Sequence, residues 1–269
     1  MSKLQLLVAT MHQKDFSLAE KMNIQCDAVF ANQTDRNSIE IKQEAYGTLT
    51  MISTATRGVG LNRNIALLAS EGDIILFADD DVTYYEGMPE HVTAAFQNNP
   101  DADVLVFGID ILKGGEITER RHLKRKKLHI WNAMRFGTYV IAARRNAIIQ
   151  HNITFYQYFG GGCMYGSGED NLFLKACFDA GLKVYSDEFV LGTCCKDESS
   201  WFVGCNEKYF YDKGVLMGYL FPRTKYLMTL YFALRCKKET QIGALKRVGL
   251  MYKGLRNSQR LIPYEPQKA

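Results

Sequence analysis

The sequence has no run of about 18 consecutive apolar residues, the length that a membrane-spanning helix requires. Its most apolar long stretch, residues 215–234, is interrupted by Pro222, Arg223 and Lys225. The opening residues, MSKLQLLVAT, include neither a long apolar segment nor a small-residue cleavage site, so we expect no signal peptide. These absences predict a chain that does not cross a membrane.

Cysteine pairs with metal-binding spacing are also absent. The seven cysteines are odd in number, and no CxxC pair occurs among them. Cys194 and Cys195 are adjacent, and neighbouring cysteines rarely bridge each other. We therefore expect free thiols in a reducing compartment and no zinc site.

Charge of one sign is not in large excess, since the 269 residues carry a formal net charge of only +4. This is too weak to indicate a nucleic-acid partner, and 47% hydrophobic with 23% charged residues is typical of a globular protein with a sizeable core. The basic residues are unevenly distributed. A dense basic run lies within residues 120–127, and ten Lys or Arg stand against one acid between Arg223 and Arg260.

Short apolar runs alternate with amphipathic stretches along the first half of the chain. We expect strands at Leu4–Ala9, Asp27–Ala31, Ile74–Phe77, Val104–Ile109 and Tyr139–Ala142. Helices are expected at Ser17–Met22, Leu61–Ala69 and Pro89–Gln97. This alternation predicts an α/β fold with a mainly parallel central sheet and helices on both faces. Ligands of such sheets bind outside the carboxyl ends of the strands, where functional residues should lie.

The segment GDIILFADDDVTYY ends an apolar strand in three consecutive aspartates, Asp79, Asp80 and Asp81. Clustered carboxylates repel one another, and a divalent cation with a preference for oxygen ligands, Mg²⁺ or Mn²⁺, offsets that repulsion. On an extended chain Asp79 and Asp81 point to the same side and can share one metal ion. The alternative is a solvated turn after the strand.

A second chemistry is compatible with the same residues. Asp79-x-Asp81-x-Thr83 fits the DxDxT pattern of haloacid-dehalogenase-type phosphatases, in which the first aspartate is a nucleophile. That pattern normally lies on the first strand, whereas here it ends the third expected strand, and no later GDxxxD arrangement follows.

Two other segments have the character of binding or catalytic sites. In RGVGLNRNIAL, Asn62 can cap a helix whose first turn presents Arg63 and Asn64, an arrangement that binds anions; a capped surface helix is equally consistent. In FGGGCMYGSGEDNLFL, Glu169 and Asp170 follow glycines at a helix start, where they can serve as a positioned base or merely as a cap.

These three segments, in this order and spacing, resemble a family-2 glycosyltransferase of the GT-A fold, over roughly residues 4–220. The segment DESSWFVGCNEKYFYDKG resembles the bacterial capsule or cell-surface polysaccharide branch of that family. The resemblance implies a GT-A catalytic domain at 1–220 with a nucleotide-sugar half (1–110) and an acceptor half (111–220). A basic amphipathic helical extension at 221–269 follows.

The resemblance also implies roles for single residues. Asp170 corresponds to the catalytic base of inverting members, with Glu169 beside it. The metal, Mn²⁺ or Mg²⁺, is assigned to Asp79 and Asp81. The nucleotide sugar is assigned to Thr10, Asn32, Asp35, Arg63, Asn64, Asp79 and Asp80, of which Thr10, Asn32 and Asp35 lie where the sequence departs from the family's usual turns.

The implied reaction moves a sugar from a nucleotide-diphosphate sugar to a saccharide or lipid-linked saccharide acceptor, with inversion, in cell-surface polysaccharide biosynthesis. The implied location is cytoplasmic, peripheral on the inner face of the membrane, since a basic amphipathic extension can lie on anionic lipid. Besides the phosphatase, a non-catalytic membrane adaptor remains as an alternative. The aromatic residues Trp201, Phe202, Tyr209, Phe210 and Tyr211 form either an acceptor platform or part of the core.

Overall fold

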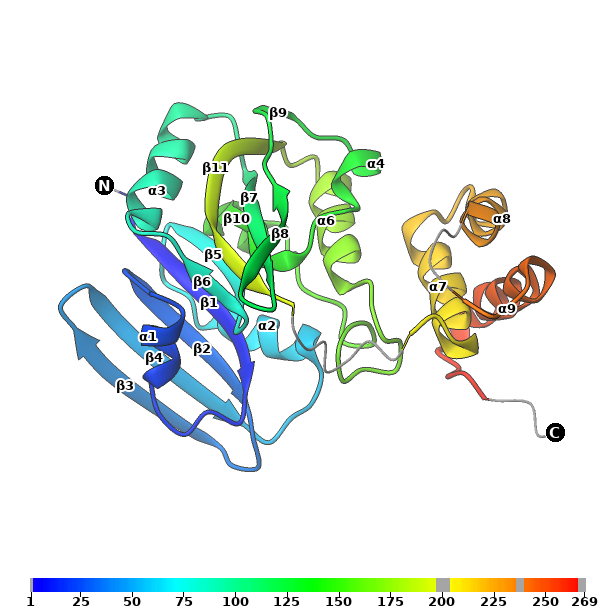
Figure 1. Ribbon diagram of the computed structural model, residues 1–269, viewed down its shortest axis with the longest axis horizontal. Coiled ribbons are helices and arrows are strands. Elements are labelled where there is room, and N and C mark those ends of the chain that lie inside the picture. The colour runs from blue at the N-terminus through cyan, green and yellow to red at the C-terminus, as the bar shows by residue number, and fades with distance from the viewer. Residues whose placement is uncertain (1, 197–203, 236–239, 266–269) are drawn as a thin grey trace.

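The computed structural model describes residues 2–196, 204–235 and 240–265, whose strands form a single sheet in the order β3-β4-β2-β1-β5-β10-β7-β11-β6, with β8 beside β7 and β9 beside β11 (Figure 1). The strands are β1 (Leu4–Met11), β2 (Asp27–Gln33), β3 (Ser38–Glu44), β4 (Gly47–Thr54), β5 (Ile74–Asp79), β6 (Val82–Tyr84), β7 (Val104–Lys113), β8 (Glu116–Arg121), β9 (Lys126–Lys127), β10 (Ile141–Arg144) and β11 (Val184–Cys195).

Helices flank this sheet, with α1 and α3 on one face and α2 and α6 on the other (Figure 1). The helices are α1 (Ser17–Lys21), α2 (Val59–Leu68), α3 (Met88–Asn98), α4 (Ile130–Ala133), α5 (Arg145–Gln150), α6 (Glu169–Asp179), α7 (Glu207–Leu220), α8 (Lys225–Arg235) and α9 (Ala244–Asn257). Short 3-10 turns cover Thr138–Val140 and Ser258–Arg260.

The centre of the sheet is parallel, as the sequence predicts. Strands β4, β2, β1 and β5 run parallel to one another, and β7 runs parallel to β11. β10 joins the two parallel sets as an antiparallel strand between β5 and β7. Apolar side chains of β1, β2, β5 and β7 are buried on both faces, which is why these segments appear as continuous hydrophobic runs in the sequence.

Several strands were not expected from the sequence. The hairpin β3–β4 forms the edge of the sheet, and its outer strand leaves Ile39 and Ile41 exposed. β11, the longest strand, was missed because register shifts interrupt its pairing with β7 and its alternation of buried and exposed residues is irregular. The strand expected at Tyr139–Ala142 begins two residues later, since a 3-10 turn occupies Thr138–Val140.

The C-terminal helices α7, α8 and α9 form a second packed unit beside the sheet (Figure 1). α7 and α9 approach closely because Gly214 and Gly254 face the opposite backbone. A Cβ atom at either position would lie 1.9–2.0 Å from the carbonyl oxygen of Met251 or Tyr211. The domain boundary after residue 220 stays a prediction, and α7, which precedes it, packs on the helices that follow it.

Candidate active site

The carboxyl ends of β1, β2 and β5 meet at one edge of the sheet, since these strands are parallel neighbours. A cavity of about 310 Å³ opens at this edge. It brings together six residues that the sequence indicated, Thr10, Arg63, Asp79, Asp80, Asp81 and Glu169. Segments up to 159 residues apart in the sequence therefore converge on one acidic site.

Arg63, from α2, joins the two acidic motifs of this cavity. Its guanidinium donates to the carboxylate of Asp79 over 2.6 Å and to that of Glu169 over 2.9 Å. Burial opposes the charge of Arg63, but the two carboxylates hold its pKa above the ordinary value. A buried arginine with two acidic partners fixes Asp79 and Glu169 relative to each other.

The other two aspartates have partners of their own. Asp80 accepts a 2.7 Å hydrogen bond from the hydroxyl of Thr10, at the end of β1. Asp81 lies 3.3 Å from the ammonium of Lys196, which follows β11. Burial is the main reason that the pKa values of Asp80 and Asp81 are raised.

A divalent ion at this site would need free carboxylate oxygens. Oδ1 of Asp81 is buried without a hydrogen-bond partner, which leaves one oxygen available as a ligand. Across residues 2–196, 204–235 and 240–265, no group of three or more Asp, Glu, His or Cys side chains is arranged to hold a metal. Mg²⁺ in nucleotide sites is commonly held by one or two carboxylates plus substrate phosphates. The assignment of Asp79 and Asp81 to an ion that binds together with a diphosphate stays a prediction.

Asp170 follows Glu169 in the first turn of α6, yet it is not among the residues that line the acidic cavity. Its Oδ1 accepts from the backbone N–H of Asn171 over 2.7 Å. Burial, reinforced by the charge of Glu169, raises the pKa of Asp170 to about 7. Asn171 lines a larger and mostly apolar cavity of about 790 Å³ between α6 and the C-terminal helices. Asp170 thus lies between Glu169, which lines the acidic cavity, and Asn171, which lines the apolar cavity.

Three of the residues assigned to the nucleotide sugar do not line the acidic cavity. Asn64 exchanges two hydrogen bonds with the backbone of Phe155, which ties α2 to that segment. The Asn32 side chain is fully buried and bonded to the backbone of Gln13 and to Ser53. Asp35 accepts from the hydroxyl of Thr34 beyond the end of β2. Their contacts with a nucleotide stay a prediction.

The expectation that Asn62 caps a helix is wrong. α2 begins at Val59 with Gly58 before it and no side-chain cap, so Asn62 lies inside the helix. Its amide instead donates to the carbonyl oxygens of Thr10 and Ala31. Asn62 therefore anchors α2 to the ends of β1 and β2 and lines the cavity itself.

Lys196 and Gln33 also line the cavity and were missed from the sequence. Lys196 follows a strand that was not recognised in the sequence. Gln33 has no distinctive sequence pattern, since an uncharged residue at a strand end is common. The glycine-rich loop contributes Gly161, whose carbonyl accepts from the N–H of Val59 at the start of α2.

The aromatic residues of the C-terminal half divide between two environments. Phe210 and Tyr211 are buried in the helical core, as expected if these aromatic residues form part of the core rather than an acceptor platform. Tyr209 is half-buried and lines the apolar cavity. Trp201 and Phe202 lie outside the described residues.

Comparison with known proteins agrees with this arrangement. Residues 22–160, more than half of the chain, match the family described as "Glycosyl transferase family 2". The chain belongs to this family. Family 2 membership makes the chain a glycosyltransferase rather than a phosphatase or a non-catalytic adaptor, and confirms the activity that the sequence motifs indicate. A search of curated protein sequences gave no significant match.

Solved structures show the same fold. The crystal structure of S. aureus TarS 1-349 in complex with UDP-GlcNAc has a TM-score of 0.59 at 15% identity, covering 96% of this chain and 73% of that one. The complex of the same protein with UDP has a TM-score of 0.55 at 16% identity, covering 95% and 71%. At this identity the likeness concerns the fold alone, and it confirms the predicted GT-A arrangement.

Two further expectations concern the whole chain. Among the cysteines in the described ranges, Cys26, Cys163, Cys177 and Cys194 are free thiols. Among the residues that the structure describes, none of the helices combines the length and the apolar character needed to span a bilayer.

Proposed function

We propose that this family-2 enzyme transfers a sugar from a nucleoside-diphosphate sugar to a saccharide or lipid-linked saccharide acceptor, with inversion at the sugar. The observation that supports this best is the pairing of Arg63 with both Asp79 and Glu169. Arg63 connects the carboxylates at the end of β5, which suit a metal ion bound to a diphosphate, with the acidic residues at the start of α6. We assign the catalytic base to these residues of α6.

The donor belongs at the carboxyl edge of β1 and β5, next to Thr10, Arg63, Asp79 and Asp80. The edge of a parallel sheet is where nucleotides bind in α/β folds. The TarS structures that share the fold contain UDP-GlcNAc and UDP, which supports a nucleotide-sugar donor here. Residues 1–110 would form this donor half, and residues 111–220 the acceptor half.

Asp79 and Asp81 would hold Mn²⁺ or Mg²⁺ together with the donor diphosphate. Such an ion supplies Lewis-acid stabilisation of the negative charge that grows on the leaving diphosphate. Lys196, whose ammonium is 3.3 Å from Asp81, is a second positive charge at the same place. It offsets the repulsion between Asp81 and an incoming phosphate.

The transfer itself is a single displacement. The acceptor oxygen forms a bond to the anomeric carbon as the bond from that carbon to the diphosphate oxygen breaks, and its electron pair leaves with the diphosphate. Asp170 takes the proton of the acceptor hydroxyl. A pKa of about 7 suits this role, because the carboxylate is then both ionised in part and basic enough to accept a proton at neutral pH. Glu169, held by Arg63, positions this turn of α6.

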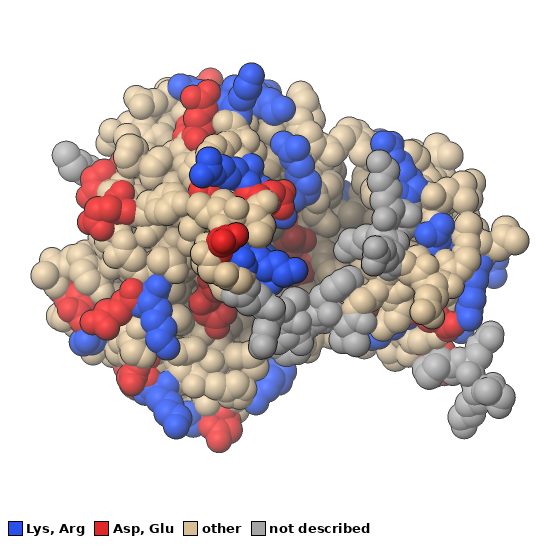
Figure 2. All heavy atoms as spheres, viewed as in Figure 1, with Lys and Arg blue, Asp and Glu red and all other residues tan. Residues whose placement is uncertain are grey.

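The C-terminal helices support a membrane-associated role in cell-surface polysaccharide synthesis. α8 exposes apolar side chains, with Leu227 at 67% and Leu234 at 57% of their full surface. Lys and Arg predominate over Asp and Glu on the part of the molecular face formed by these helices (Figure 2). Exposed apolar residues among basic ones are typical of helices that lie on anionic membranes.

The test is a screen of the purified chain against a panel of sugar nucleotides with Mn²⁺. We expect release of the nucleotide from one donor, and transfer when a suitable acceptor is supplied. Absence of nucleotide release from every donor of the panel would contradict the proposed donor class.

A further inference from the structure

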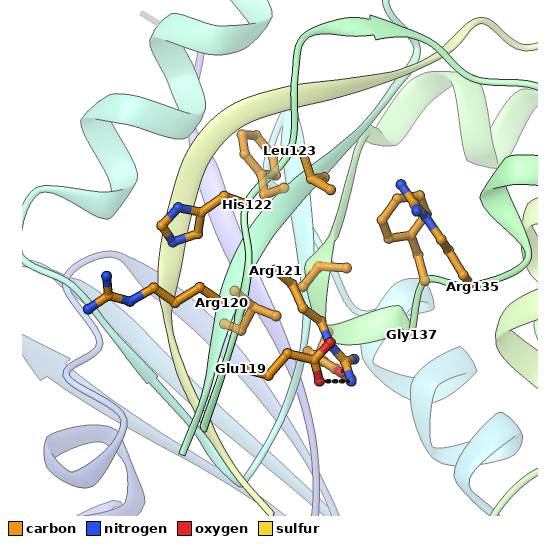
Figure 3. A pocket seen from close by; sticks show the side chains of 12 residues that line it. Glu119, Arg120, Arg121, His122, Leu123, Arg135 and Gly137 are labelled. Atoms are coloured by element: carbon orange, nitrogen blue, oxygen red, sulfur yellow. Dashed lines mark hydrogen bonds and ion pairs between the residues drawn. The ribbon is translucent and has the colours of Figure 1, made fainter. Parts of the chain in front are cut away.

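A second polar cavity lies beside the candidate donor site. It has a volume of about 410 Å³ and is bounded by β8 on one side and by residues 135–140 on the other (Figure 3). Both walls come from the half of the chain that follows β7. None of the residues with a predicted role lines it.

The charged side chains of β8 divide between its two faces, as alternation along a strand requires. Arg120 and His122, the latter just after β8, both border the cavity, but their side chains point away from Arg135, and His122 pairs with Asp110 over 3.0 Å (Figure 3). Arg121 lies on the other face and donates to Glu119 over 2.9 Å and to the hydroxyl of Tyr139 over 3.4 Å. β8 therefore presents one arginine to the cavity, held by one carboxylate.

The opposite wall presents a second arginine, Arg135 (Figure 3). Its guanidinium lies 4.9 Å from the ring centre of Phe136, which orients the group. No carboxylate in the described parts of the chain forms an ion pair with Arg135. Two guanidinium groups face one carboxylate, Glu119, so the cavity has an excess of positive charge.

Tyr139 connects this cavity to the donor site. Its ring forms part of the cavity wall, and the ammonium of Lys196 lies 4.9 Å from the centre of that ring. Lys196 in turn pairs with Asp81 and lines the acidic cavity. The side chains of Tyr139 and Lys196 therefore connect the second cavity to the acidic cavity.

We propose that this cavity binds an anionic group, a phosphate or a carboxylate, carried by the acceptor saccharide. This rests on the proposed transfer reaction and specifies its acceptor as a charged glycan. Arginine recognises both anions through paired N–H donors, and Arg135 has its donors available. The cavity adjoins Lys196, which lines the acidic cavity, but is separate from that cavity.

The experiment measures binding, so it does not depend on turnover. Glucose 6-phosphate, glucuronate and neutral glucose are titrated into the full chain by ligand-observed NMR, with and without the nucleotide found in the donor screen. We expect the anionic sugars to bind about tenfold more tightly than glucose, in line with a charge-assisted hydrogen bond, and to lose this preference at high salt.

Two arginines of the same region provide a matched comparison. Arg135→Ala should remove most of the preference for the anionic sugars, whereas Arg120→Ala, on the outer face of β8, should leave it within about twofold. Glu119→Gln should strengthen anion binding, because Glu119 carries the one carboxylate among the described residues that line the cavity. Nucleotide affinity should be unchanged in all three variants.

Three results would overturn the proposal. They are equal binding of glucose and its 6-phosphate by the parent chain, equal losses in the two arginine variants, and a loss of nucleotide affinity in Arg135→Ala, which would assign the cavity to the donor. Failure of the proposed transfer function would appear separately, as an absence of nucleotide release in the donor screen.

Discussion

Arg63 and Glu169 are 106 residues apart in the sequence, yet the guanidinium of one donates to the carboxylate of the other over 2.9 Å. The same guanidinium holds Asp79 at the end of β5 over 2.6 Å. This contact joins the two parts of the candidate active site, because α2 lies in the part of the chain proposed to bind the donor and α6 in the part proposed to bind the acceptor.

Replacing Arg63 by methionine should destabilise the fold. The substitution keeps most of the buried volume but leaves Asp79 and Glu169 as repelling carboxylates. Breaking a buried ion pair costs about 3–5 kcal/mol, and partial exposure of Asp79 puts the expected loss near the lower end. Denaturant unfolding measures it. Arg36→Met, which removes an exposed pair with Glu40, should cost under about 1 kcal/mol, and equal losses in the two variants would contradict the bridging role.

Asp170→Asn should separate donor binding from transfer. The amide has nearly the shape of the carboxylate but is a very poor proton acceptor, so the turn of α6 should keep its packing. Nucleotide affinity by calorimetry should stay within a few-fold of the parent, while transfer falls by about 10² or more. Transfer within about threefold of the parent would make Glu169 the next candidate, and a collapse of nucleotide affinity would place Asp170 in the donor site.

The rate of transfer should rise with pH around neutrality. The pKa of Asp170 is raised to about 7, mainly by burial and then by the charge of Glu169. A base must be ionised to act, so kcat/KM should increase as pH rises through about 7 and level off above about 8. A pH profile measured at constant ionic strength checks this. A profile that is flat from about pH 5 to 8 would mean that another group, or none, accepts the proton.

The central sheet could be predicted from the sequence because β1, β2, β5 and β7 are buried on both faces and give continuous apolar runs. Strand β3 could not, since it lies at the edge, leaves Ile39 and Ile41 exposed and has no clear buried face. Strand β11 could not be predicted for a different reason, because register shifts in its pairing with β7 interrupt the period-two pattern.

The residues of the candidate site could be predicted from the sequence where charged residues are concentrated in short segments. Asp79 to Asp81, Glu169 and Arg63 have local sequence patterns, and the structure brings them to one cavity. The partners of these residues have no such pattern. Lys196 follows an unrecognised strand, and Asn62 has the composition of a helix cap although its amide binds the carbonyls of Thr10 and Ala31. Contacts of this kind depend on tertiary packing.

Activity should require a divalent ion, and Asp81→Ala should abolish it while the fold stays intact. Asp81 has a buried oxygen without a hydrogen-bond partner, as expected of a metal ligand that is completed by substrate. Nucleotide release with added Mn²⁺, added Mg²⁺ or excess chelator tests the requirement. Asp101→Ala, at a surface ion pair with Lys183, serves as a control with unchanged activity. Full activity in excess chelator would exclude the metal.

The C-terminal helices should bind anionic membranes through charge. Charge replacement is a cleaner test than truncation, because Met251 and Leu255 of α9 are buried in the helical core and on α7. Four cations are replaced together by glutamine, the half-buried Lys225 of α8 and the exposed Lys253, Arg256 and Arg260 of α9 and the segment after it. Each basic residue at an anionic surface contributes about 1 kcal/mol. Binding to phosphatidylglycerol-containing vesicles should therefore fall by at least about tenfold.

A matched variant tests whether membrane binding depends on the charge of the C-terminal helices or on the net charge of the whole protein. Four lysines of the catalytic domain are replaced by glutamine at Lys14, Lys42, Lys113 and Lys183, which lowers the net charge equally but leaves α8 and α9 intact. Co-sedimentation of this variant should stay close to that of the parent and should weaken as salt rises, since exposed charges are screened. Equal losses in both variants would show that attraction depends on the net charge alone. Binding that responds to neither anionic lipid nor salt would show that the basic face of these helices is only solvated.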